Sequence, residues 1–198
     1  MKLDDKEEGI RDEVLCKAQK LFKRFGWAKT TMEDIAKAAG KGKSTLYYYY
    51  KSKEEIFDAV VTREMEEVFR ITKEEVDKKQ TAEEKLRAFS VTKFHILQHK
   101  ENLCGVVRGD IQANIQHLLE LNRRFELREI TLVRSILRFG LENGEFGHFK
   151  TADTDAVAFA MVCAFRGVEI GLLVENKVID FESRMDVIHD ILMHGLKA

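Results

Sequence analysis

Basic side chains are concentrated in one short segment of this chain of 198 residues. Between Val14 and Lys53 there are ten lysines and arginines and two acidic residues, whereas the whole chain carries a formal charge of −1. A compact positive segment beside an acidic body is typical of a module that binds nucleic-acid phosphates next to a domain with another task. Taken alone, the same segment also fits the solvated face of a lysine-rich helix.

The other reactive residue types lack the spacing that catalysis or metal binding needs. His95 and His99 stand four residues apart, which would allow a shared metal ion, but no glutamate or cysteine pair completes a zinc site. The cysteines Cys16, Cys104 and Cys163 form no CxxC pair, and we expect Cys104 to be the reactive thiol. Because GxSxG, HExxH and phosphate-binding-loop motifs are also absent, we expect no enzymatic activity, metal or cofactor.

The elements that position these residues are expected to be helices. The chain has no proline and 12 dispersed glycines, which suits long helices joined by short loops. The longest apolar run, Ala156 to Phe165, is shorter than a membrane span, and we expect it to be a buried core helix. The first nine residues resemble no targeting signal, so we expect a cytoplasmic protein without membrane contact.

Two helices are predicted in the first part of the basic segment. An apolar stripe over residues 14–25 predicts a first helix that ends at Gly26. Thr30, followed three residues later by Glu33, predicts a capping box and a second helix from about Thr31.

A glycine turn and a third helix follow. Gly40 and Gly42 flank Lys41, and a short helix opens at Lys43. The small residue Ala36 allows the second and third helices to cross closely. Two short helices joined by such a turn make a helix-turn-helix.

The segment AQKLFKRFGWAKTTMEDIAKAAGKGKSTLYYYYKSKEEIF resembles the N-terminal signature of the tetracycline-repressor (TetR) family of bacterial transcription regulators. The ordered LF, TT, IA, AG, TLY and KSKE motifs are far more specific than a single helix-turn-helix. The sequence departs from the family pattern at Lys41 and Gly42, where an aliphatic residue and a serine are common, at Ser44 and at Tyr50. We expect the stem of Lys41 to cover the helix crossing while its ammonium reaches solvent or a phosphate.

The resemblance implies that the third helix enters the major groove of double-stranded DNA. Its first turn would reach base edges, with lysine suited to guanine acceptors. The residues expected at base edges are Lys43, Ser44 and Thr45, and those expected at phosphates are Thr31, Lys41, Tyr47, Tyr48 and Lys53.

The run of four tyrosines from Tyr47 to Tyr50 has two interpretations. Successive helical residues point about 100° apart, so we expect Tyr50 to join Leu46 in the core while Tyr48 faces DNA. The alternative is an aromatic platform that stacks single-stranded bases.

Six more helices are predicted after this module, and we expect the whole chain to be all-α. We expect a DNA-binding domain over residues 1–52 and an effector-binding and dimerisation domain over residues 53–198. Ser52, Thr81 with Glu84, and Asp180 are expected to cap helices. The expected ranges are 52–79, 81–99, 103–114, 116–141, a helix from residue 151 or 153, and one from 180.

Apolar and polar residues in the body suggest a ligand site. The candidates are Phe94, His95, Arg108, Gln112, Met161 and Phe165. Arg108 lies among apolar residues and is suited to bind the carboxylate of a hydrophobic or amphipathic effector. The alternative for Arg108 is a salt bridge with Asp110 or a neighbouring helix.

A stripe of small residues marks the helix after residue 153. Its members are Ala156, Ala160, Ala164, Gly167 and Gly171. Helical glycines cost about 0.5–1 kcal/mol each, so their clustering on one face indicates close packing. The family resemblance implies a homodimer interface through the last two helices; the alternative is a close crossing within one chain.

These features favour a homodimeric, ligand-responsive transcriptional regulator, in particular a repressor released from its operator by a small effector. The alternative is a helical-bundle carrier or enzyme in which the basic segment is incidental.

Overall fold

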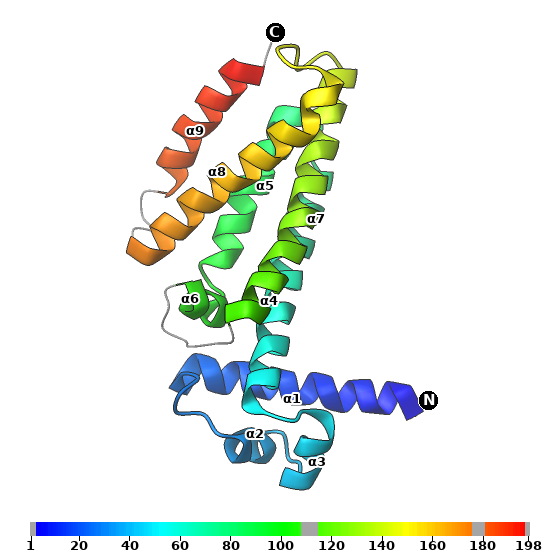
Figure 1. The fold of residues 1–198 in the computed structure, drawn as a ribbon, viewed down its shortest axis with the longest axis vertical. Coiled ribbons are helices and arrows are strands. Elements are labelled where there is room, and N and C mark those ends of the chain that lie inside the picture. Colours follow the sequence, from blue (N-terminus) through cyan, green and yellow to red (C-terminus); the bar gives the residue numbers. More distant parts are fainter. Residues whose placement is uncertain (1–2, 108–114, 176–180, 197–198) are drawn as a thin grey trace. The chain divides into compact units, whose positions relative to one another are not determined.

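The computed structural model describes residues 3–107, 115–175 and 181–196, and all regular structure in these ranges is helical (Figure 1). The all-α prediction is therefore confirmed. The chain forms two compact units: the first is Met1–Met65 with Glu101–Leu118, and the second is Glu66–Lys100 with Leu119–Ala198. The predicted boundary after residue 52 concerns function and stays a prediction.

The first unit is built on helices packed around a small apolar core. Its described elements are α1 (Leu3–Phe25), α2 (Met32–Ala38), α3 (Lys43–Tyr49), the start of α4 (Lys53–Asp77) and α6 (Glu101–Val107). Helix α2 packs on both α1 and α3, and α6 packs on α1. Ile35, Leu46 and Ile56 are fully buried and bring α2, α3 and α4 to one core. This is the predicted helix-turn-helix.

Glycine ends two of these helices, as predicted. Gly26 and Gly40 have φ angles of 80° and 62°, in the left-handed region that glycine adopts without strain. The predicted capping box is wrong by one residue. Thr31, not Thr30, accepts from the backbone N–H of Asp34, whose carboxylate in turn accepts from the N–H of Thr31. Thr30 is buried, and its hydroxyl donates to the carbonyl of Gly26 at 2.8 Å.

A buried carboxylate ties three helices of the first unit together. Glu64 of α4 is 2% exposed, and the hydrogen bonds that it accepts from described residues come from neutral donors. Its oxygens accept from Gln19 Nε2 of α1 at 2.9 Å, from Asn102 Nδ2 at 2.7 Å and from the backbone N–H of Leu103 at 3.1 Å. Because a buried carboxylate is costly without hydrogen bonds, these three donors must stay in place, and α6 is held against α1 and α4.

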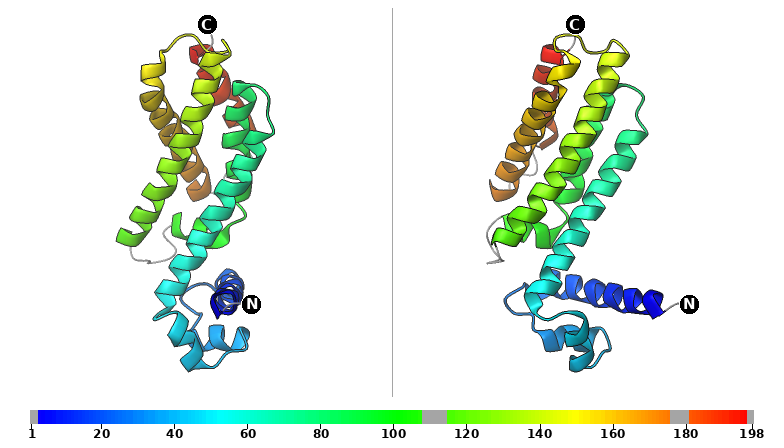
Figure 2. Two further views of the ribbon diagram at one scale, coloured as in Figure 1. Left: turned by 90° about the vertical axis from the view of Figure 1, so that its right-hand side faces the viewer. Right: turned by 45° about the vertical axis from the view of Figure 1, so that its right-hand side comes forward.

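The second unit is a bundle of longer helices (Figures 1 and 2). It contains the end of α4, α5 (Ala82–Leu97), most of α7 (Ile115–Glu142), the 3-10 turn η1 (Thr151–Asp153), α8 (Thr154–Glu175) and α9 (Phe181–Leu196). The predicted capping box of Thr81 and Glu84 is confirmed at the start of α5. Phe89 and Phe165 are buried with ring centroids 6.2 Å apart and join α5 to α8. The predicted cap Asp180 lies outside the described residues.

Helix α8 is not the buried core helix that its apolar run predicted. One of its faces packs inside the unit through Ala158, Met161 and Phe165, but Ala156 and Phe159 lie on an exposed face. By length and composition, Thr151–Leu173 is apolar enough to cross a membrane, with a mean hydropathy of 1.8. Such a helix is weak evidence of a membrane span, because the core helix of a soluble protein passes the same test.

The expectation for the cysteines is also wrong. Cys104 is 2% exposed, so the thiol that we expected to be reactive is shielded by the first unit. Cys163 of α8 is exposed, and its Sγ lies 4.0 Å from Glu126 Oε1. Thiol reactivity requires access as well as thiolate formation, so Cys104 lacks the first requirement.

Candidate functional site

The first turn of α3 presents its side chains to solvent. Lys43, Ser44 and Thr45, the residues predicted to reach base edges, are all exposed. The turn begins at Gly42, which makes no side-chain cap. This exposed turn has the size and polarity that reading a major groove requires.

The four tyrosines divide between surface and core. Tyr47 and Tyr48 are exposed, whereas Tyr49 and Tyr50 are buried under Arg11 of α1, whose guanidinium lies 5.5 Å and 5.4 Å from their ring centroids. Burial raises the pKa of Tyr50 above its usual value. Two exposed adjacent rings cannot form a four-ring stacking surface. The expected burial of Tyr50 is confirmed, and the contact of Tyr48 with DNA stays a prediction.

Lys53 lies at the start of α4 and is held by the single tryptophan of the chain. Its ammonium lies 4.0 Å from the ring centroid of Trp27 and donates to the carbonyl of Trp27 at 3.0 Å. A lysine over an indole face makes a favourable cation–π contact, which restricts a side chain that is otherwise flexible. Lys53 therefore has a fixed position from which further N–H donors can reach a phosphate.

Two other predicted phosphate contacts already have partners in the first unit. The ammonium of Lys41 lies 3.0 Å from Glu13 Oε2 of α1, so this side chain bridges to α1. The hydroxyl of Thr31 donates to Asp34 Oδ2 at 2.6 Å, and its hydroxyl and backbone N–H together lower the pKa of Asp34. A phosphate would have to share or displace these bonds.

The predicted ligand residues of the body do not converge on one described site. Phe94, Met161 and Phe165 are buried in the core of the second unit. His95 is exposed, and its Nδ1 lies 3.3 Å from Gln98 Nε2. Arg108 and Gln112 lie outside the described residues.

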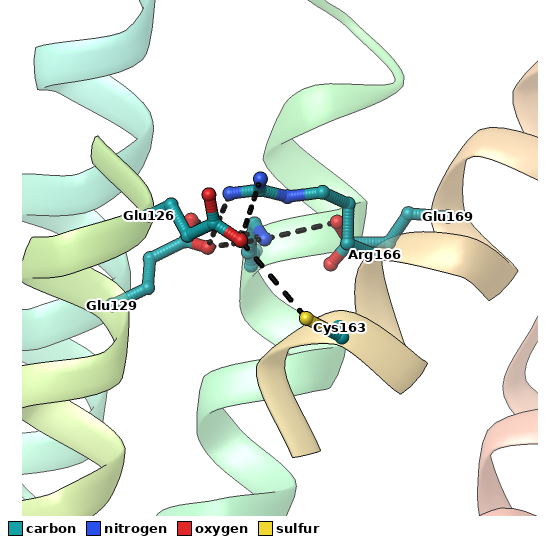
Figure 3. Close-up of polar contacts among 6 residues, drawn as sticks. Glu126, Glu129, Cys163, Arg166 and Glu169 are labelled. Carbon is teal, nitrogen blue, oxygen red and sulfur yellow. Dashed lines mark hydrogen bonds and ion pairs between the residues drawn. The ribbon is translucent and has the colours of Figure 1, made fainter. Parts of the chain in front are cut away.

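A cluster of charged side chains lies inside the second unit (Figure 3). Lys93 of α5 is buried, and its ammonium lies 3.0 Å from Glu129 of α7 and 2.9 Å from Glu169 of α8. Arg166 of α8 reaches Glu126 at 3.3 Å and Glu129 at 3.5 Å. These pairs connect α5, α7 and α8 through groups that water does not screen.

Burial and ion pairing oppose one another in this cluster. Burial lowers the pKa of Lys93, but the attraction of Glu129 and Glu169 outweighs that effect and the pKa lies above its usual value. Burial raises the pKa of Glu169, opposed by Lys93. Glu169 Oε1 is buried and has no hydrogen-bond partner among the described atoms. The cluster carries three carboxylates against two cations and is not fully satisfied internally.

A buried histidine lies along the same helices. His189 of α9 has its Nε2 2.7 Å from the hydroxyl of Ser90, and its ring centroid is 5.7 Å from that of Phe165. Burial lowers the pKa of His189 below its usual value, aided by Arg87. His189 of α9 therefore links α5 through Ser90 and α8 through Phe165.

Comparison with known proteins decides the family. The model described as "Bacterial regulatory proteins, tetR family" matches residues 14–60, which include α2, α3 and the start of α4. The HTH-type transcriptional repressor KstR2 of Mycolicibacterium smegmatis is 31% identical over 140 residues, which are 69% of this chain and 67% of that protein. The chain belongs to the TetR family.

Two further relatives extend the similarity over nearly the whole chain. The HTH-type transcriptional regulator YhgD of Bacillus subtilis is 24% identical over 187 residues, 93% of this chain and 95% of that protein. The transcriptional regulator FadR of Bacillus subtilis, solved in complex with stearoyl-CoA, has a TM-score of 0.68 at 20% identity and covers 93% of this chain and 98% of its own. The latter similarity concerns the fold.

As a TetR-family protein, the chain is a DNA-binding transcriptional regulator, and its family is not an enzyme family. Residue types alone did not reveal Trp27 and Glu33 as neighbours of predicted DNA-contacting residues, or Arg11 as the neighbour of the buried Tyr49 and Tyr50. Arg11 and Glu33 bond to residues of α3 that lie 38 and 10 positions later in the sequence. Helical periodicity does not predict such contacts. The indole of Trp27 could have been paired with Lys53 only from the fold.

The DNA interface predicts different losses for its two lysines. Lys53→Ala should lower affinity for a selected site and for a scrambled duplex alike, and should reduce the slope of log K against log salt by about 0.9, because one phosphate contact is lost. Lys43→Ala should weaken the selected site by about tenfold or more and scrambled DNA much less, because a base contact is lost. Fluorescence anisotropy over a salt titration measures both.

The exposed Lys78 of the second unit supplies the control, since Lys78→Ala should leave both duplexes unaffected. Equal losses on the two duplexes for Lys43→Ala would contradict a base-reading role for this residue.

The buried cluster predicts a large stability effect. Lys93→Met should lower the free energy of unfolding by about 3–5 kcal/mol, because Glu129 and Glu169 lose their buried partner. Replacing all three residues by apolar ones should recover most of that loss. Urea denaturation at fixed protein concentration measures both variants. In the exposed pair Lys73–Asp77, Lys73→Met is the matched control and should change stability by less than about 1 kcal/mol; a similar change for Lys93→Met would refute the prediction.

Proposed function

We propose that the protein is a homodimeric repressor that binds an operator through two copies of α3 and leaves it when a small effector binds the body. The exposed first turn of α3, with Lys43 at its start, carries the proposal. Two copies must match half-sites about 34 Å apart, so an effector that prefers another spacing weakens DNA binding by its differential affinity. The relative KstR2 is named a repressor, which supports the direction of regulation. We propose that it acts in the cytoplasm, where its operator is.

Exposed apolar side chains on the last two helices support the homodimer. The stripe predicted from sequence, Ala156, Ala160, Ala164, Gly167 and Gly171, is exposed along α8. Phe159 and Ile170 of α8 and Val187 and Ile191 of α9 are also exposed, by 43% to 67%. Such apolar exposure marks an interaction surface, and a second copy of the chain would cover it.

The helical glycines favour a second copy over a crossing within one chain. No described atom lies within 4 Å of a Cβ built at Gly167 or Gly171, so packing within the described chain gives no reason for glycine there. A helix of another copy could approach closely at these positions. This disfavours the alternative in which the stripe serves an internal helix crossing.

We further propose that the effector is an amphipathic anion with an acyl chain. The structure of the FadR relative holds stearoyl-CoA, and the second unit here has a large apolar interior that includes Phe94, Met161 and Phe165. Arg108, Gln112 and His95 are the proposed polar contacts. Among the described cations of the second unit, Lys93 and Arg166 are already paired with carboxylates. We propose Arg108 as the partner of the anion because it stands among apolar residues in the sequence.

A gel shift tests the regulator and its effector together. The protein should shift the duplex upstream of its own coding region and not a scrambled duplex, and stearoyl-CoA should release it. Arg108→Ala should keep the shift but require several-fold more stearoyl-CoA, because one charge-assisted contact is lost. Coenzyme A alone is the control for the acyl chain. Retention of the shifted complex at saturating stearoyl-CoA would contradict the effector class, and the absence of any shift would contradict the operator.

The dimer is tested by two matched glycine substitutions. The wild-type chain should sediment at about twice its 22.9 kDa. Gly167→Leu should shift it towards monomer, because the added side chain separates the helices of the two copies. Gly9→Leu, at an exposed helical glycine of α1 with no atom within 4 Å, should leave the dimer intact. A wild-type monomer at micromolar concentration, measured by analytical ultracentrifugation, would overturn the proposal.

A further inference from the structure

An exposed ion pair joins the two helices of the helix-turn-helix at their starts. Glu33 lies in the first turn of α2 and Lys43 is the first residue of α3. Glu33 Oε1 and Lys43 Nζ lie 2.5 Å apart, and their side chains are 70% and 56% exposed. The Glu33 carboxylate therefore lies next to Lys43, the side chain that we expect to reach a base.

Stability does not explain this carboxylate. Exposed ion pairs add little to folding, because solvent screens them and the two side chains lose conformational entropy on forming them. The other acidic residue between Val14 and Lys53 is Asp34, which is bonded to the backbone N–H and hydroxyl of Thr31 in the cap of α2. Glu33 makes no such cap bond. Its bonding partner in the structure is Lys43, whose pKa it raises through their hydrogen bond.

A carboxylate on a DNA-facing surface has an electrostatic cost. Phosphates repel it, so Glu33 weakens binding to every sequence unless it gains a contact that depends on the base. The base edge that offers such a contact is the N4 amino group of cytosine, a donor that glutamate accepts from in the major groove.

The paired side chains match the edge of one base pair. A G·C pair presents the guanine O6 and N7 acceptors beside the cytosine N4 donor, whereas an A·T pair presents a different order of groups and a methyl. Lys43 offers donors and Glu33 offers acceptors at hydrogen-bonding distance from one another. We propose that Glu33 is a specificity-determining residue and that Glu33 and Lys43 together read one G·C base pair in each half-site. This inference rests on the proposed entry of α3 into the major groove.

The two members of the pair then have opposite effects on general affinity and the same effect on specificity. Removing Lys43 takes away a positive charge, and removing Glu33 takes away a negative one. Glu33→Ala should therefore bind scrambled DNA more tightly than the wild type, by a few-fold, while losing discrimination at the G·C position. No role in folding alone predicts that combination.

The experiment starts from a duplex selected by the wild-type full chain from a randomised library. Dissociation constants are then measured by anisotropy for single base-pair changes across one half-site, with wild type, Glu33→Ala, Lys43→Ala and the double variant. Both single variants should lose about tenfold discrimination at the same G·C pair, and the double variant should lose no more than either. Glu54→Ala, which removes another exposed carboxylate of the first unit, is the control and should keep every preference.

The outcomes separate the inference from the function on which it rests. If the wild type selects a sequence but Glu33→Ala retains every preference, or if the two single variants relax different positions, the joint reading of a base pair is wrong and the regulator stands. If the wild type selects no sequence, the proposed function and the inference both fall. Circular dichroism of each variant verifies that the first unit is folded.

Discussion

The first unit depends on satisfying one buried carboxylate. Glu64 is buried at the point where α1, α4 and α6 meet, and it takes its hydrogen bonds from a side-chain amide of α1, another of α6 and a backbone amide of α6. Neutral donors stabilise a buried charge only when they are well directed, so all three helices must keep their positions. Residues from beyond position 100 thereby become part of the unit that holds the helix-turn-helix.

In the second unit, buried carboxylates are stabilised by cations instead of neutral donors. Lys93 is buried between Glu129 and Glu169, and Arg166 adds a second cation. Buried ion pairs rarely stabilise a fold more than apolar packing would, but removing one partner strongly lowers the free energy of unfolding. They therefore specify which turns of α5, α7 and α8 face one another, whereas apolar contacts alone would tolerate sliding.

Features that depend only on neighbouring residues in the sequence were predicted. Glycine turns at Gly26 and Gly40, the cap at Thr81 and the exposure of Tyr48 follow from local rules and were predicted. The cap of α2 was misassigned because two adjacent threonines each precede an acidic residue by three positions. Glu64 and Lys93 escaped prediction because a charged residue in a helical sequence looks the same whether it faces water or a partner forty residues away.

The solvent exposure of individual residues was also not predicted reliably from the sequence. An apolar helix such as α8 and a thiol such as Cys104 were assigned to the inside or the outside from their neighbours in sequence, and both assignments failed. Burial depends on which other helices cover a residue, and in α8 it depends on the second copy that we propose. Single-chain periodicity does not distinguish a face that packs within the chain from one that packs between chains.

The position of Trp27 gives this protein a built-in optical reporter. The chain has one tryptophan, it lies in the turn between α1 and α2, and an ammonium rests against its ring. Indole emission responds to nearby charge and solvent, so the fluorescence of the unlabelled protein comes from the helix-turn-helix unit and from no other part of the molecule. Events at Lys53 and unfolding of the first unit can thus be followed spectroscopically without attaching a dye.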